Sequence, residues 1–206
     1  LEFGGGVSLI FRAYDDAAAY LWKTGFDREI VVNSEIAAFR FSEDFPLFFQ
    51  EEESFFTHSE RKNLHLRLSE ITPERMACCP ALVELDGRVK VAVTESDLRD
   101  YAGMYLAGGA SAHCLAGRFP RFVTSEEQRG DRNVAPTERA DYLARTSGDR
   151  VFPWRVLIIT DSDRQLLDNQ TVFKLGQEQM IEDTSWIRPG KVAWDWWNYN
   201  NIYGVD

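Results

Sequence analysis

The chain has 206 residues, enough for one sizeable hydrophobic core or for one domain with a short extension. It carries 23 Lys and Arg against 33 Asp and Glu, a formal charge of −10, which excludes the basic surface that nucleic acids and anionic membranes require. An acidic chain of this kind suits neutral ligands or a cation such as calcium, which prefers carboxylate oxygens.

Cysteine and histidine usage indicates neither a disulfide framework nor a metal cage. The three cysteines are odd in number and two of them are adjacent, while the three histidines are scattered. No run of about 18 apolar residues is present, so no membrane-spanning segment is predicted. The first six residues lack the charged and apolar regions of a signal peptide. Either a precursor was trimmed or the sequence begins inside a longer protein, and we expect the second.

The N-terminal third reads as strands. Residues 7–14 predict a strand, and Asp15-Asp16 before three alanines either turns into a second strand or caps a helix. Ala37, Phe39 and Phe41 share one face of a half-buried strand within residues 29–41. The acidic run 51–53 is expected to be a solvated loop.

The middle of the chain contains the strongest hairpin signal. Leucines alternate with His65 and Arg67 over residues 64–68, which places His65 away from the core. Asp86-Gly87 predicts a hairpin between residues 81–85 and 88–94. Along its second strand a row of valines ends in Glu95. This carboxylate either serves as a ligand at the rim of the sheet or lies in the first turn of a helix, where its charge favours the positive end.

The remaining segments are less regular. Residues 115–150 predict a long irregular connection. Residues 152–159 are apolar on both faces and predict a buried strand, in which Trp154 packs in the core and Arg155 forms a surface ion pair, although both could line a sugar site. Residues 161–170 favour a short helix or turn, and residues 171–175 a last strand.

Four of the six tryptophans lie in the last 21 residues. Pro189-Gly190 is a turn signal, and the aromatic and β-branched run after it predicts a strand over residues 191–197. A buried aromatic strand is the simplest reading of these tryptophans.

Several of these segments resemble glycoside hydrolase family 97, the calcium-dependent α-glucosidases and α-galactosidases. The run SWIRPGKVAWDWWN at residues 185–198 is similar to that family's junction between the N-terminal β-sandwich and the catalytic barrel. VAVTE at residues 91–95 and RADYLART at residues 139–146 also resemble it. Residues 14–21 resemble a family hairpin, but Ala17 stands where glycine is usual and Leu21 where arginine is usual. Ala17 would be strained if that turn required a positive φ.

The resemblance implies a mainly β fold, an antiparallel β-sandwich of the super-sandwich type with a C-terminal stub of a (β/α)8 barrel. Residues 1–182 are expected to be the sandwich, incomplete at its N-terminus, and residues 183–206 the linker and first barrel strand. The implied function is the N-terminal portion of an exo-acting α-glucosidase or α-galactosidase located in the periplasm or outside the cell. The alternative is a free-standing β-sandwich module that binds carbohydrate or protein.

The resemblance also implies site residues. Glu95 is expected to reach a Ca²⁺ ion at the barrel's active site, as one ligand of six to eight. Barrel sites form at the C-terminal ends of the strands, so Trp197 and Asn198, with Trp196 and Asp195 beside them, are expected to contact an oligosaccharide or α-glycoside substrate. The catalytic carboxylates belong to the remainder of the barrel, so these 206 residues alone are expected to be inactive.

Overall fold

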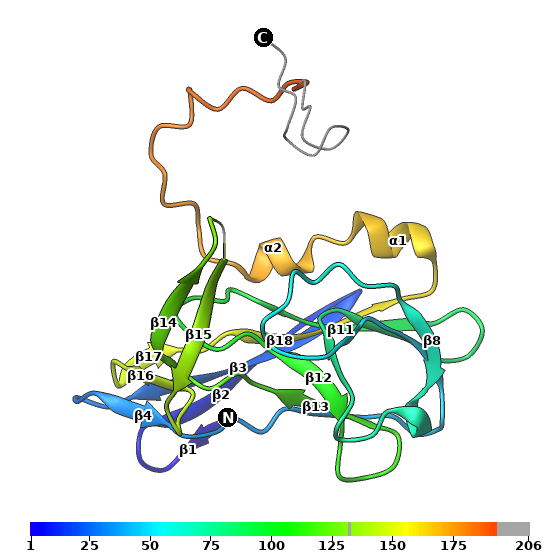
Figure 1. Cartoon of the computed structure of the whole chain (residues 1–206). Helices are drawn as coiled ribbons and strands as arrows, with labels where there is room; N and C mark the ends of the chain where they lie inside the picture. Colours follow the sequence, from blue (N-terminus) through cyan, green and yellow to red (C-terminus); the bar gives the residue numbers. More distant parts are fainter. Residues whose placement is uncertain (132, 193–206) are drawn as a thin grey trace. The chain divides into compact units, whose positions relative to one another are not determined.

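The fold is known from a computed structural model, which describes residues 1–131 and 133–192 (Figure 1). Residues 1–176 form one compact unit and residues 177–206 a second. The described part of the second unit, residues 177–192, contains no helix or strand, and Trp186 and Val192 are exposed there. The expected domain boundary after residue 182 stays a prediction.

The larger of the two main sheets has nine strands, all paired antiparallel. In spatial order the main path is β1 (Glu2–Phe3), β2 (Val7–Tyr14), β3 (Ala17–Gly25), β18 (Trp154–Thr160), β11 (Lys90–Ser96), β10 (Ala81–Glu84), β6 (Pro46–Phe49) and β8 (Leu64–Arg67). Strand β17 (Asp149–Val151) also pairs with β3.

The second sheet has five antiparallel strands, in the order β5 (Ala38–Arg40), β13 (Cys114–Arg118), β12 (Tyr105–Gly108), β9 (Met76–Cys78) and β7 (Glu51–Glu52). Two small pairs complete the strands, β14 (Val123–Arg129) with β15 (Asn133–Arg139), and β16 (Ala144–Thr146) with β4 (Ile30–Val32). The helical elements are short: the 3₁₀ turn η1 (Leu68–Glu70), α1 (Asp163–Asp168) and α2 (Thr171–Leu175).

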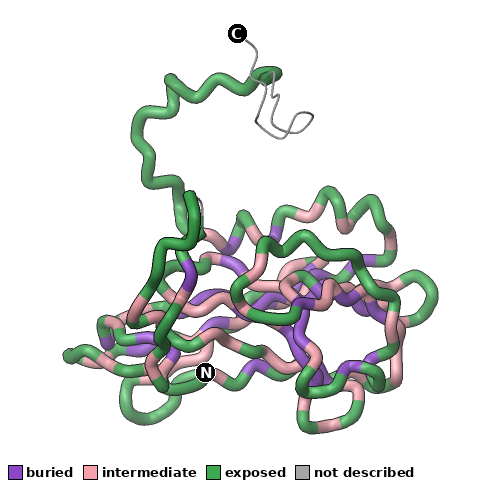
Figure 2. The backbone as a smooth tube through the Cα atoms, in the orientation of Figure 1, coloured by how far each residue is buried: buried purple, intermediate pink, exposed green. Residues whose placement is uncertain are grey.

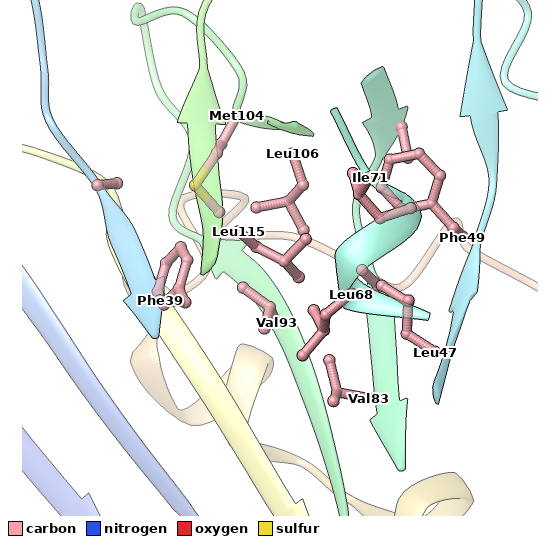
Figure 3. Packing of buried hydrophobic residues seen from close by; sticks show 13 residues of the cluster. Phe39, Leu47, Phe49, Leu68, Ile71, Val83, Val93, Met104, Leu106 and Leu115 are labelled. Carbon is pink, nitrogen blue, oxygen red and sulfur yellow. The ribbon is translucent and has the colours of Figure 1, made fainter. Parts of the chain in front are cut away.

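The main core lies between the two large sheets. Val83 and Val93 from the nine-stranded sheet pack in one cluster with Phe39, Leu106 and Leu115 from the five-stranded sheet (Figure 3). Leu106, Leu115 and Val93 are completely buried. The buried stretches, purple in Figure 2, lie in the interior of the strand-rich part of the chain. This is the packing of a β-sandwich, so the expected fold class is confirmed.

The outer face of the nine-stranded sheet carries a second, smaller core. Ala92, Trp154 and Val156 point to this face and pack with Leu175 of α2. The two short helices lie over this side of the sheet (Figure 1). Both faces of β11 and β18 are therefore covered, which explains their nearly continuous apolar sequences.

The strongest local patterns are confirmed. The strand at residues 7–14 is β2, and it pairs with β3 through a two-residue turn at Asp15-Asp16 rather than entering a helix. Ala17 is not among the described residues with positive φ, so the expected strain is absent there. The Asp86-Gly87 hairpin joins β10 to β11, and β11 continues to Ser96, which rules out a helix start at Glu95.

The expected irregular connection over residues 115–150 is wrong, because five strands, β13 to β17, cover most of it. The hairpin of β14 and β15 is polar because most of its residues are exposed, with Ala135 the buried exception within the described part of these two strands. A hairpin exposed on both faces has no two-residue hydrophobic period, so its sequence resembles a loop.

Two further expectations are wrong. Residues 171–175 form the helix α2 and not a strand, because Thr171 and Leu175 lie one turn apart and both are buried on the same side. The acidic run at residues 51–53 is not a solvated loop. Glu51 and Glu52 form β7, and the buried Glu52 carboxylate accepts hydrogen bonds from Thr57 Oγ1 at 2.7 Å and Arg61 Nε at 3.1 Å.

Residues 1–131 and 133–192 contain no helix long and apolar enough to cross a membrane. The strand expected at residues 191–197 begins at two described residues that have no regular structure, and its other positions lie outside the described residues.

Candidate functional site

Three neighbouring strands place a row of polar side chains on the face that points into the sandwich. Arg155 of β18 pairs directly with Glu95 of β11 on one side and with Tyr20 of β3 on the other. These residues share a face with Val93 and Leu157, which belong to the inter-sheet core. The polar row therefore borders the hydrophobic core at the end of β11, where it forms a polar rim.

The centre of this row is a buried ion-pair network. Arg155 is 1% exposed, and its guanidinium lies 5.0 Å from the centre of the Phe119 ring. It donates from Nε and Nη2 to the two oxygens of Glu35, both at 2.7 Å, and from Nη1 to Glu95 Oε2 at 2.6 Å. Glu35, from the segment between β4 and β5, thus forms a two-bond fork with Arg155, the strongest geometry for an arginine and a carboxylate.

The Glu95 carboxylate is held from a second side by the backbone. The Met104 N–H donates to Oε1 at 3.0 Å and to Oε2 at 3.1 Å. The Met104 carbonyl accepts a hydrogen bond from Cys79 Sγ at 3.2 Å, so the N–H and the carbonyl of Met104 are both hydrogen-bonded. Burial raises the pKa of Glu95, Arg155 and the Met104 N–H oppose the shift, and the negative charge of Glu35 adds to it.

The loop that returns from β11 to β12 is itself fixed. Asp97 and Asp100 have positive φ values of 57° and 45°. Arg150 Nη2 donates to the carbonyl oxygens of Arg99 and Asp100 at 2.7 and 3.2 Å, and its guanidinium lies over the rings of Tyr101 and Phe152. This arginine therefore holds the loop that delivers the Met104 N–H to Glu95.

Two surface pockets flank the network. One, of about 540 Å³, is lined by Trp22, Glu35, Tyr101 and Phe152 among others. The other, of about 410 Å³, is lined by Tyr101, Gly103 and several arginines. A Cβ added to Gly103 would lie 3.5 Å from Glu95 Oε1, so this pocket approaches the Glu95 carboxylate closely.

Glu95 can supply one ligand to a bound cation, but the described residues do not supply the other ligands. Glu95 retains 14% exposure, and among the described residues its Oε1 accepts a hydrogen bond from Met104 alone, which leaves lone-pair capacity on a hard oxygen. Within residues 1–131 and 133–192, no group of three or more His, Cys, Asp or Glu residues could hold a metal ion. The Glu95 carboxylate therefore fits the role of one calcium ligand. A calcium ion bound there would need its other ligands from outside the described residues.

The expected sugar-contacting residues Trp197, Asn198, Trp196 and Asp195 lie outside the described residues, so their role stays a prediction. Trp154 packs in the outer core as expected. Arg155 forms an ion pair, but the expected surface location is wrong. Sequence reasoning missed Glu35, although a lone arginine in an otherwise apolar strand was a signal that a buried acidic partner exists.

The fold and the polar rim define an antiparallel β-sandwich domain with a partly exposed carboxylate oriented by a buried arginine. Residues 1–177 match the family described as "Glycosyl-hydrolase 97 N-terminal", and the chain belongs to this family. It is 32% identical over 217 aligned residues to a retaining alpha-galactosidase of Bacteroides thetaiotaomicron. That alignment covers all of this chain but 33% of the relative, so the chain spans about a third of the curated relative's length.

Solved structures of the same family share the fold. A glycoside hydrolase family 97 enzyme from Pseudoalteromonas sp. strain K8 in complex with acarbose superposes with a TM-score of 0.73 at 16% identity. A variant of the enzyme from that strain in complex with panose gives the same TM-score and identity. Both alignments cover 89% of this chain and 25% of the other chain.

Proposed function

We propose that this chain is the N-terminal β-sandwich of a calcium-dependent exo-α-glycosidase, and that Glu95 donates one oxygen ligand to the calcium ion. The observation that carries the proposal is the Glu95 carboxylate at the end of β11, partly exposed and held by Arg155 and the Met104 N–H. Metal ligands are oriented by such neighbouring hydrogen bonds. A bound calcium would polarise the glycosidic oxygen or a neighbouring acid on the leaving-group side.

The substrate class follows from the relatives. The chain is similar to a retaining alpha-galactosidase and to enzymes solved with acarbose and panose, so we assign it α-galactosides or α-glucosides. In this proposal Asp195, Trp196, Trp197 and Asn198 form part of the active-site wall, and the two catalytic carboxylates come from the rest of a barrel. The place of action is the periplasm or the outside of the cell, as for most members of the family.

The test is calorimetric titration of calcium into the complete enzyme and its Glu95→Gln variant. Loss of a charged oxygen ligand is expected to weaken calcium affinity by about tenfold or more and to lower turnover of nitrophenyl α-galactoside or α-glucoside. The matched control is Glu84→Gln on the neighbouring strand β10, where the carboxylate contacts His65 and Lys90. Equal calcium affinity in the Glu95 variant and the wild type would refute the metal role of Glu95.

A further inference from the structure

We propose that Glu35 is a positioning residue for the metal ligand: it occupies two donors of Arg155 so that the guanidinium touches only one oxygen of Glu95. This inference rests on the proposed calcium role of Glu95. Glu35 itself is 6% exposed and is not a candidate ligand.

The geometry supports a division of the arginine between two carboxylates. Glu35 accepts from Nε and Nη2 on one edge of the guanidinium, and Glu95 accepts from Nη1. Without Glu35, the Nη2 donor beside Nη1 would lose its partner and could pair with the second oxygen of Glu95, because bidentate pairing is the preferred contact of arginine with a carboxylate. That contact would engage both oxygens of Glu95 and leave less capacity for a cation.

Charge balance points the same way. With both carboxylates ionised, the three groups sum to −1, because one guanidinium faces two carboxylates. Removal of the Glu35 charge would leave Arg155 and Glu95 as a neutral pair. A calcium ion approaching Glu95 would then meet a ligand whose charge is already neutralised by Arg155, in a poorly solvated place where charges interact strongly.

The burial of the network makes this arrangement specific. Arg155 is confined by the Phe119 ring and by the pairing of β18 with β3 and β11. Tyr101 lies close enough to Glu35 and Arg155 that burial, followed by the negative charge of Glu35, raises its pKa. A buried ion pair of this kind contributes little net stability compared with apolar residues of the same size, which agrees with a positioning role.

The experiment is calorimetric titration of calcium into the complete enzyme carrying Glu35→Gln, Glu35→Asp or Glu52→Gln. Glu35→Gln is expected to raise the calcium Kd about tenfold, and Glu35→Asp, which keeps the charge, to recover most of the affinity. The matched control is Glu52→Gln, since Glu52 is also a buried carboxylate paired with an arginine, Arg61, but lies in β7 of the other sheet. Its calcium Kd is expected to be unchanged.

The outcomes separate the two proposals. Loss of calcium affinity in Glu95→Gln with wild-type affinity in Glu35→Gln would overturn the positioning role and keep the metal role. Equal losses in Glu35→Gln and Glu52→Gln would show a general effect of destabilisation and would also overturn it.

Should Glu35→Gln fail to fold, the Glu35→Asp variant decides. Aspartate keeps the charge and the two carboxylate oxygens that pair with Nε and Nη2, so a Kd close to that of the wild type with unchanged thermal stability supports the positioning role, and a Kd as poor as that of Glu95→Gln contradicts it.

Discussion

At the scale of single residues, this protein uses arginine to place carboxylates. Arg155 holds Glu35 and Glu95 in the buried network, Arg61 holds Glu52, and Arg75 holds Glu51. A buried carboxylate without a partner is costly, so each acidic residue inside the sandwich needs a donor. The acidic composition of the chain is therefore tolerated in the interior only where the fold brings an arginine to the same point.

The pair of Glu51 and Arg75 gives a prediction on pH. Arg75 donates to the two Glu51 oxygens at 2.6 and 3.0 Å, and this hydrogen bonding, opposed by burial, lowers the pKa of Glu51 from 4.5. A lowered pKa in the folded state contributes stability above the unfolded pKa, and this contribution is lost as the pH falls through the folded pKa. The pair is about a third exposed, so its contribution at pH 7 is expected to stay below about 1 kcal/mol.

Glu51→Gln should therefore be less stable than the wild type at pH 7, and the difference should be smaller at an acidic pH below the lowered pKa of Glu51. Urea unfolding at both pH values measures this, with Glu53→Gln as the control at the neighbouring exposed position. A gap that persisted unchanged at acidic pH would show that the pair does not depend on the Glu51 charge.

At the scale of the elements, the backbone of β12 in the five-stranded sheet packs closely against the backbone that follows the turn η1. Gly108 ends β12 beside the segment that follows η1, and a Cβ added there would lie 2.1 Å from the Ile71 carbonyl oxygen. The Gly108 N–H donates to the Thr72 carbonyl at 3.1 Å, which ties the two segments together. No side chain fits at this position without backbone movement.

Gly108→Ala is therefore expected to destabilise the domain by about 1 to 3 kcal/mol through overpacking. The control is Gly4→Ala, because nothing lies within 4 Å of a Cβ added to Gly4 and its φ is not positive. Thermal unfolding of the two variants measures the difference. A Gly108 variant as stable as the Gly4 variant would mean that β12 and the turn can separate at little cost.

At the scale of the whole molecule, the proposed function makes the sandwich a support for a reaction centre that other residues complete. Cleavage of a glycosidic bond needs two carboxyl groups, one as acid and one as nucleophile or base, on either side of the anomeric carbon. Among the described residues, the two carboxylates of the buried network, Glu35 and Glu95, are both bound to Arg155. Neither is free to serve as the general acid while it is paired in this way.

The 206-residue chain alone is therefore expected to show no turnover of nitrophenyl α-galactoside or α-glucoside, with or without millimolar calcium. The matched positive control is the complete enzyme assayed under the same conditions. Measurable turnover by the 206 residues would contradict the assignment of catalysis to residues outside the sandwich.

The sequence by itself determined those features that depend on neighbours along the chain. Alternation and turn chemistry located β2 and the hairpin of β10 and β11, because a strand with one face in the core must repeat every second residue. The resemblance over residues 91–95 also singled out Glu95 before its surroundings were known. The strands β14 to β17 and the helix α2 were missed, because exposure or packing against distant residues, and not local preference, decides their form.

Only the tertiary structure decided what surrounds Glu95. Arg155 is 60 residues away from Glu95 and 120 away from Glu35, and their contact depends on the register between β11 and β18 and on the path of the segment before β5. A shift of one residue in that register would turn Arg155 to the opposite face of the sheet. The buried network is thus a product of long-range strand pairing, and the lone arginine of β18 signals an acidic partner without identifying which residue it is.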